Sequence, residues 1–211
     1  RDTTRANWIA GVSHDIRTPL ALIMGYGEQL AQQAPPQSEQ QKKAAAICTQ
    51  SQKIKALIED LNLTFKLQYN AQPLRRTAVP MGAWLRQSVA DFCDSLGENY
   101  SVGLQIREPA GQTVLEADRE LLTRALDNLL NNSVRHNPGG CDIQVAAELE
   151  DGRFVLTVRD NGAGYPEAVL RNLFGTDDPN APHILGLHLV QQIATAHEGE
   201  ASFCNDGGAV A

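Results

Sequence analysis

Residues 9–30 read IAGVSHDIRTPLALIMGYGEQL, and apolar positions recur through this stretch in alternating steps of three and four residues. These positions are Ile9, Val12, Ile16, Pro19, Ile23, Tyr26 and Leu30. An unbroken alternation of this kind is the a/d pattern of a helix that packs along a seam. After the break at Pro35-Pro36 a second apolar repeat begins, carried by Ile47, Ile54 and Leu61. We therefore expect two long helices between Thr3 and about Tyr69.

Two helices joined by a short loop form an antiparallel hairpin. One hairpin buries only one seam, so the sequence favours two hairpins from two chains, which form a dimeric four-helix bundle. The alternative is a hairpin that packs on a second domain of its own chain.

Beyond Gln72-Pro73 the pattern changes to mixed helix and strand. We expect helices at 81–96, at about 119–136 after an Asp118 N-cap, and at about 184–197. We expect strands at 102–106, 113–115, 141–150, 153–159 and 201–204, with a hairpin turn at Asp151-Gly152. This order predicts a two-layer α/β sandwich, so the fold class is α + α/β.

The predicted domains are a helical hairpin at 1–72 and a sandwich at 79–211, joined by a linker around 73–78. We interpret the chain, which begins at Arg1, as a piece of a longer protein.

The composition excludes several classes of protein. The 25 acidic and 18 basic residues give a net charge of −7, and no cluster of Lys and Arg is dense enough for sequence-independent nucleic-acid binding. No apolar run approaches the roughly 18 residues that span a membrane, so we expect no membrane contact in this fragment. The four cysteines, Cys48, Cys93, Cys141 and Cys204, form no C-x-x-C pair and are interpreted as buried thiols in a reducing compartment.

His14 occupies position f of the heptad, two residues before Ile16, and is therefore expected to face solvent. Asp15 follows it, and Thr18 lies one helical turn on. Pro19 is expected to bend the helix, because it lacks an N–H and clashes with the preceding turn. An exposed imidazole beside a carboxylate and a helix distortion is typical of a nucleophile.

The full run at 13–20, SHDIRTPL, closely resembles the phosphoacceptor box of the sensor histidine kinases of two-component signalling. The resemblance continues in chain order. NLLNNSVRH at 128–136 is similar to the family's N box, and DNGAG at 160–164 to its first glycine box. LF at 173–174 is similar to the F box, and LGL at 185–187 to the end of the second glycine box. The resemblance implies a sandwich of the gyrase/histidine-kinase ATPase type. The family continues into a closing strand where this chain ends with GGAVA at 207–211, so the resemblance implies a truncated or partly ordered C-terminus.

The N box places Asn128 and Asn132 on one helix face, where amide oxygens suit a Mg²⁺ ion that shares a nucleotide's phosphates. The resemblance implies that Asn132 is the metal ligand and that Asn128 is a supporting polar contact. It implies a phosphate contact for Arg135, and His136 is included among the expected nucleotide-binding residues.

In the first glycine box, Gly162 and Gly164 allow the backbone to approach a planar ligand closely. The resemblance implies that Asp160 accepts a hydrogen bond from the adenine amino group. Gly186 and Leu187 complete the expected ATP site.

The expected phosphate-binding region departs from the family pattern. Pro182 and Ile184 stand near positions where the family usually carries further glycines, and the lid at 175–181 carries Asp177 and Asp178 without basic residues. Both departures predict weaker phosphate binding, and therefore either a reduced affinity for ATP or an unusual arrangement of the lid. The four histidines other than His14 show no recognised metal-ligand spacing, and we interpret them as surface or packing residues: His136, His183, His188 and His197.

The resemblance implies an ATP-dependent protein-histidine kinase that phosphorylates its own His14, with Asp15 as general base and tautomer clamp. The phosphoryl group would pass to an aspartate of a response-regulator receiver domain. Thr18 matches the position that orients water for dephosphorylation of that partner. The resemblance also implies that the chain forms a homodimer. It implies that this fragment is cytoplasmic and that its parent protein lies in the bacterial inner membrane.

Two alternatives remain open. The altered second glycine box favours a degenerate, weakly ATP-binding kinase that acts as a dimeric interaction module. A gyrase-type ATPase or a serine kinase would share the nucleotide sandwich, but neither requires the box around His14.

Overall fold

The computed structural model describes residues 2–69, 71, 73–173 and 185–211. The chain divides into two compact units, Arg1–Gln72 and Pro73–Ala211, which are described separately. Among the described residues, no helix is long and apolar enough to cross a membrane.

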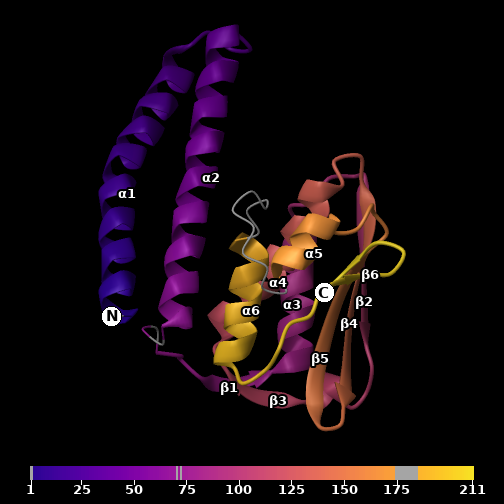
Figure 1. Ribbon diagram of the computed structural model, residues 1–211. Helices are drawn as coiled ribbons and strands as arrows, with labels where there is room; N and C mark the ends of the chain where they lie inside the picture. Colours follow the sequence, from indigo (N-terminus) through magenta and orange to yellow (C-terminus); the bar gives the residue numbers. More distant parts are fainter. Residues whose placement is uncertain (1, 70, 72, 174–184) are drawn as a thin grey trace. The chain divides into compact units, whose positions relative to one another are not determined.

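The first unit is a hairpin of two helices, α1 (Asp2–Gln33) and α2 (Glu39–Gln68), as the repeats predict (Figure 1). The N-terminus of α2 is capped by Ser38, whose hydroxyl oxygen accepts the Gln41 N–H at 3.1 Å. Pro19 lies inside α1, which continues through it to Gln33. The Pro35-Pro36 connection ends one helix before the next begins.

Small side chains line the interior of this hairpin. Ser13, Leu20 and Gly27, spaced by seven on α1, are buried, as are Ala44 and Ser51 on α2. A Cβ atom on Gly27 would lie 2.8 Å from Cys48 Sγ, so a larger residue there would force the helices apart.

The predicted a/d seam is not the interior of the hairpin. Ile16, which the repeat predicts to be a core residue, is 41% exposed, and Tyr26 is 63% exposed. The reason is that the small residues permit a close approach on a neighbouring face of α1, which leaves the larger apolar side chains outside.

The second unit contains two β-sheets. Strands β1 (Thr77–Pro80) and β3 (Val114–Ala117) form an antiparallel pair. The other sheet has the spatial order β2 (Tyr100–Ile106), β4 (Cys141–Glu150), β5 (Arg153–Asp160), β7 (Ala209–Val210), β6 (Cys204–Asn205). Strands β2 and β4 are parallel, and the other neighbours in this sheet are antiparallel.

Three long helices cover one face of the five-stranded sheet (Figure 1). They are α3 (Met81–Cys93), α4 (Arg119–His136) and α6 (Leu185–Ala196). The short elements η1 (Ala110–Gln112) and α5 (Glu167–Leu173) complete the unit. Leu85 and Leu130 of the helices join Ile143 and Val145 of the sheet in one buried apolar core. The predicted two-layer sandwich is confirmed.

Local signals account for two of the boundaries in this unit. The Asp118 carboxylate accepts the Leu121 N–H at 3.2 Å and caps α4, as predicted. Asp151 and Gly152 have φ values of 47° and 79°, and positive φ at both central residues is what a type I′ hairpin turn requires.

Three predictions about these elements were wrong. Thr77 and Ala78, predicted to be linker, belong to β1. The strand predicted at 201–204 forms only at Cys204–Asn205. Helix α5 lies where the sequence predicts a loop, because Pro166 starts a short apolar turn that buries Val169.

The thiols and the C-terminus also differ from simple expectation. All four cysteines are free, but only Cys141 is buried, while Cys93 and Cys204 are exposed.

Ala209–Val210 pairs with β5, and Ala211 exchanges two backbone hydrogen bonds of 2.9 Å with Val158. A closing strand of this sheet is therefore present in short form.

Candidate functional site

The residues of the SHDIRTPL run all lie within α1. Ser13 and Leu20 are buried against the hairpin interior, whereas Asp15 and Thr18 are exposed. The backbone of His14 is helical, and its side chain lies outside the described part of the chain. The helix therefore presents Asp15 and Thr18 to solvent, three residues apart.

In the second unit, tertiary structure joins the N box to the second glycine box. Asn128 on α4 donates from Nδ2 to the Arg124 carbonyl oxygen at 2.9 Å, which fixes its amide plane. A Cβ atom on Gly186, at the start of α6, would lie 2.7 Å from Asn128 Oδ1. Gly186 thus allows α6 to begin directly beside the N box, while Asn132 lies one turn further along α4 and is half-buried.

Asp160 ends β5 and is only 4% exposed. Its Oδ1 atom accepts the Gly162 N–H at 2.9 Å and the Ala209 N–H at 3.3 Å. Neither bond uses Oδ2. A buried carboxylate held in this way can accept a hydrogen bond from an amino group of a ligand.

The glycine-containing loop after Asp160 is closely packed on both sides. A Cβ atom on Gly162 would collide with the side-chain amide of Asn137, the C-cap residue of α4. Gly164 has a φ of 79°, and a Cβ atom there would lie 2.6 Å from Asn205 Oδ1. Glycine is needed at both positions for the loop to fit between α4 and the β6–β7 turn.

Electrostatics near the end of α4 favour a neutral His136. Burial lowers the pKa of His136, the positive charge of Arg135 lowers it further, and Asp160 opposes both effects. Arg135 Nη2 lies 3.3 Å from His136 Nε2. Arg135 and His136 are exposed at the surface, and the contact of Gly162 with Asn137 places this end of the N box beside the first glycine box.

Two other groups are kept uncharged around Asp160. Burial raises the pKa of Tyr165, and the charges of Asp160 and Cys204 raise it further. Burial also raises the pKa of the Cys141 thiol, followed by the effect of Asp160, although a hydrogen bond with Asn137 opposes the shift. Both groups therefore hold their protons more firmly than a free phenol or thiol does.

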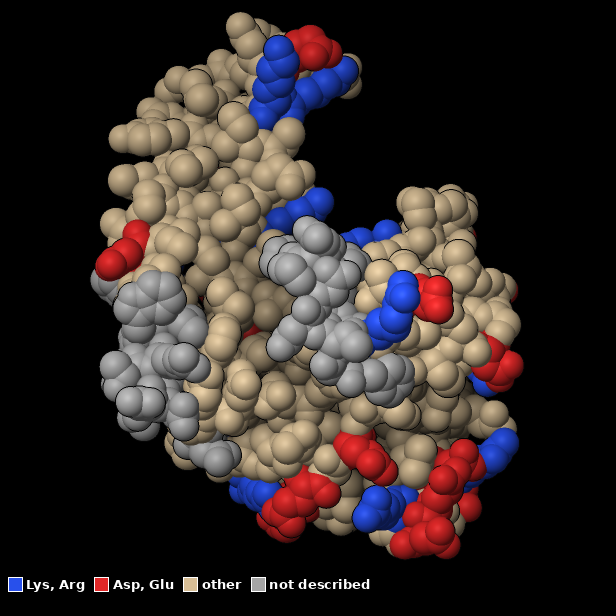
Figure 2. All heavy atoms as spheres, viewed as in Figure 1, with Lys and Arg blue, Asp and Glu red and all other residues tan. Residues whose placement is uncertain are grey.

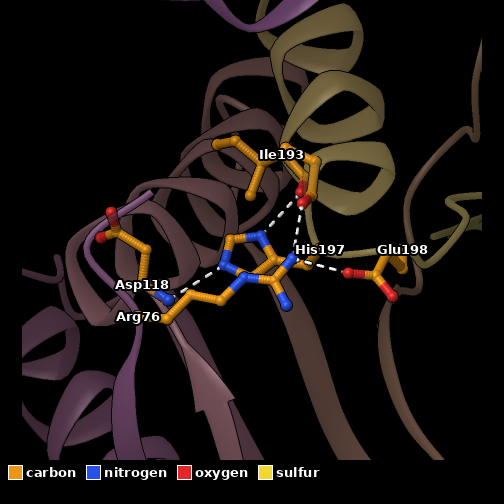
Figure 3. Close-up of polar contacts among 6 residues, drawn as sticks. Arg76, Asp118, Ile193, His197 and Glu198 are labelled. Atoms are coloured by element: carbon orange, nitrogen blue, oxygen red, sulfur yellow. Dashed lines mark hydrogen bonds and ion pairs between the residues drawn. The ribbon is translucent and has the colours of Figure 1, made fainter. Parts of the chain in front are cut away.

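Away from the candidate site, a polar cluster around His197 joins the start of α4 to the end of α6 (Figure 3). His197 Nε2 accepts the Asp118 N–H at 3.0 Å, so the ring proton is on Nδ1, which donates to the Ile193 carbonyl oxygen at 2.8 Å. Arg76 contacts Glu198 at 2.8 Å. His197 is thus a packing residue, as the sequence interpretation holds, with a defined tautomer.

Some site residues are absent from the sequence prediction. Asn137, Asn205 and Ala209 hold the loop and the carboxylate of Asp160, but no motif marks them. The run NDGG at 205–208 signals a turn. It does not show which loop the turn contacts. Leu173, of the expected F box, is buried at the end of α5, whereas Phe174, the lid at 175–181, Pro182, His183 and Ile184 lie outside the described residues.

Comparison with protein families divides the chain in the same order. Residues 4–70 match the His Kinase A (phospho-acceptor) domain. Residues 117–210 match the histidine kinase-, DNA gyrase B- and HSP90-like ATPase family.

Sensor histidine kinase YvrG of Bacillus subtilis is 34% identical over 206 residues, which are 93% of this chain and 35% of that protein. Sensor protein CreC of Escherichia coli is 29% identical over 212 residues, which are 97% of this chain and 44% of that protein. The chain spans about a third to a half of the length of these curated relatives.

Among solved structures, full-length ShkA in complex with AMPPNP has a TM-score of 0.77 at 22% identity, over 97% of this chain and 44% of that chain. At such identity the likeness shows the fold. The two family domains in order, together with the sensor kinase relatives, show that the chain belongs to the sensor histidine kinases of two-component systems.

Proposed function

We propose that this chain is the catalytic core of a protein-histidine kinase that transfers the γ-phosphoryl group of ATP to His14. The observation that carries the proposal is the meeting of Asp160, its glycine loop and the N box in one unit. The same chain carries the SHDIRTPL box on an exposed helix. The matching AMPPNP complex of a histidine kinase supports ATP as the nucleotide.

The second unit binds and orients the nucleotide in this proposal. Asp160 Oδ2 accepts the adenine amino group, which excludes guanine because guanine carries a carbonyl oxygen at that position. The half-buried amide of Asn132, one helical turn from Asn128, fits Mg²⁺, which prefers a few oxygen ligands from the protein together with phosphates and waters. When bound, Mg²⁺ neutralises phosphate oxygens during transfer. Arg135 contacts the phosphates in this proposal, His136 binds the nucleotide at the end of the N box that adjoins the first glycine box, and Gly186 and Leu187 complete the site.

The first unit supplies the nucleophile. The lone pair of His14 Nε2 forms the new N–P bond, the bond between the γ-phosphorus and the bridging oxygen breaks, and ADP leaves with that electron pair. Asp15 holds the other ring N–H and accepts its proton as the imidazole loses its positive charge. Placing the γ-phosphate in line with the ring is the main catalytic task.

The phosphoryl group then passes to an aspartate of a response-regulator receiver domain. A complex of histidine kinase ThkA with response regulator TrrA, with a TM-score of 0.67 to this chain at 19% identity, supports this class of partner. We further propose that Thr18 orients a water molecule that hydrolyses the regulator's acyl phosphate. Its exposure on α1 permits that contact.

We propose that two copies of the chain pair through the hairpin. An apolar stripe on α1 remains exposed in the single chain and consists of Val12, Ile16, Ile23, Tyr26 and Leu30. A corresponding stripe on α2 consists of Ile47, Ile54, Leu57 and Leu61. Figure 2 shows much of the visible hairpin surface without charged side chains. Large exposed apolar patches mark protein interfaces, and a second hairpin would bury both stripes.

The proposed setting is the cytoplasmic side of a bacterial inner membrane, as part of a longer sensor protein. This rests on the sensor kinase relatives, which are two to three times as long as the matched region.

The test is incubation of the dimer with radiolabelled ATP and Mg²⁺. We expect acid-labile, base-stable label in the wild type, none in His14→Gln, and strongly reduced label in Asp160→Asn, whose amide would face the adenine amino group. Circular dichroism would confirm that both variants fold. Equal label in His14→Gln and wild type would contradict the proposal.

A degenerate kinase that acts as a dimeric interaction module is the second candidate. The observation in its favour is the sequence at 175–186. Its lid is acidic, and between Gly175 and Leu187 it has one glycine, Gly186. Absence of label in a wild-type chain that still forms dimers would favour this candidate over the first.

A further inference from the structure

The side chain of Asn205 pairs with the main chain of Tyr165 in the manner of a neighbouring strand. Tyr165 N–H donates to Asn205 Oδ1 at 2.7 Å, and Asn205 Nδ2 donates to the Tyr165 carbonyl oxygen at 2.9 Å. A side-chain amide carries the same donor and acceptor as a peptide group, so this bridge replaces a pair of ladder hydrogen bonds. It joins the end of β6 to the residue that follows the first glycine box.

The loop packs directly against this amide. Gly164 has a φ of 79° and no room for a Cβ atom, which would lie 2.6 Å from Asn205 Oδ1. The ring of Tyr165 meets the ring of Phe203 edge to face, with centroids 6.0 Å apart. Tyr165 is therefore held at its backbone and at its ring by residues two apart in the sequence.

The turn that follows Asn205 is itself fixed to the sheet beside Asp160. The Arg159 guanidinium donates to the Asp206 carboxylate at 2.7 Å and to the Asp206 carbonyl oxygen at 3.1 Å. Three residues further on, the Ala209 N–H donates to Asp160 Oδ1. The turn thus contacts Asp160 on one side and the end of its loop on the other.

We propose that Asn205 is a positioning residue for nucleotide binding, which holds the 161–165 loop and so fixes where Asp160 meets the base. This inference rests on the proposed ATP-binding function. Two hydrogen bonds of ordinary strength fix the loop, and their loss frees a segment whose glycines impose no conformation of their own. A loop that is free before binding must be ordered by the nucleotide, which weakens binding.

The test compares Asn205→Ala with Asn99→Ala, a change of the same residue type at an exposed position before β2. We expect Asn205→Ala to raise the KM for ATP roughly tenfold, since both hydrogen bonds to the Tyr165 main chain are lost. We expect kcat to change less than KM, and the preference for ATP over GTP to fall. The Asn99→Ala variant should match the wild type in all three quantities.

A purely structural role would lower the unfolding temperature without changing the ATP over GTP preference, and that result would overturn the proposal. If Asn205→Ala fails to fold, Asn205→Asp decides, because it keeps an acceptor for Tyr165 N–H but cannot donate to the carbonyl oxygen. Its KM should then exceed that of the wild type, and an unchanged KM would overturn the proposal.

The two proposals fail in different ways. If the wild type binds a fluorescent ATP analogue but incorporates no label, the proposed kinase function is wrong. The affinity of Asn205→Ala for that analogue still tests the positioning role, with equal affinity as the contrary result. A wild type that binds no nucleotide overturns both.

Discussion

At the scale of single residues, a side chain's neighbours decide its chemistry more than its type does. Asp160 is a buried carboxylate whose Oδ1 atom is occupied by two backbone N–H groups. Asp118 is also buried, but its oxygens accept the Leu121 N–H and the Arg75 N–H. The first is suited to a ligand, whereas the second holds a helix end and the start of the second unit.

His136 allows a prediction about pH at this scale. Its pKa is lowered in the folded chain, chiefly by burial and then by Arg135, so the unfolded chain takes up the proton more readily. Stability should therefore fall as the pH drops through the unfolded value of about 6.5. In His136→Gln, the loss of unfolding free energy between about pH 7.5 and 5.5 should be smaller than in the wild type. Urea unfolding at both pH values measures the difference.

The other histidines are the same in both proteins, so the difference isolates His136. An equal or larger loss in His136→Gln would contradict this prediction, because it would show that His136 takes up its proton at least as readily in the folded chain as in the unfolded one.

Thr18 allows a prediction about the partner. Its hydroxyl is exposed on α1, and alanine should preserve the helix, because alanine has a higher helix propensity than threonine. We expect Thr18→Ala to retain label at His14 but to dephosphorylate the labelled regulator at least about tenfold more slowly, if the hydroxyl acts in general acid–base fashion on water. Decay of labelled regulator, measured with and without the variant, gives the rate. An unchanged rate would remove Thr18 from the phosphatase proposal.

At the scale of elements, α4 and α6 each connect the candidate site to the polar cluster at the opposite end of the unit. Helix α4 begins at the Asp118 cap and carries Asn128 further along. Helix α6 begins near Gly186 and ends beside His197, which accepts the Asp118 N–H. The two helices pack on each other, so the cap at Asp118 supports the geometry of the N box.

Loss of this cap should destabilise the second unit. Asp118→Ala removes the acceptor for Leu121 N–H and for Arg75 N–H. We expect the free energy of unfolding to fall by about 1–3 kcal/mol, from a lost N-cap and a second lost hydrogen bond. Chemical denaturation provides the measurement, followed by the fluorescence of Trp84 in this unit in a Trp8→Phe background, since Trp8 is the other tryptophan of the chain.

Asp118→Asn is the matched control, because its amide oxygen can still cap α4. It should lose less stability than the alanine variant. Equal stability of Asp118→Ala and the wild type would show that water replaces the carboxylate without cost.

At the scale of the whole molecule, the hairpin alone leaves its predicted seam exposed. Ile23 is 48% exposed and Leu30 is 55% exposed, while the interior is filled by Ser13, Leu20 and Gly27. This exposure is physically unfavourable for an isolated chain and is the basis of the proposed dimer.

A charge in the middle of the stripe should prevent pairing. We expect Ile23→Glu to be monomeric at concentrations where the wild type is a dimer, because two carboxylates would be buried near one another in the bundle. Gln32→Glu adds the same charge nine residues away, on the opposite side of α1, and should remain dimeric. Sedimentation equilibrium measures the mass, and helical circular dichroism checks that α1 persists. A dimeric Ile23→Glu would place the interface elsewhere.

The sequence by itself determined the two helices, the α4 cap, the β4–β5 hairpin and the residues of the boxes. Each of these depends on neighbours close in the chain, through heptad spacing, capping and turn chemistry. Strand β1, the short β6 and helix α5 escaped prediction, because pairing and burial by distant segments decide them.

Only the tertiary structure decided which face of α1 is the hairpin interior, because small residues carry no strong apolar signal yet permit the closest packing. It also decided that Asn205 meets Tyr165 and that Ala209 meets Asp160. These contacts use backbone groups and a common polar side chain, whose partners depend on where the chain folds back rather than on local sequence.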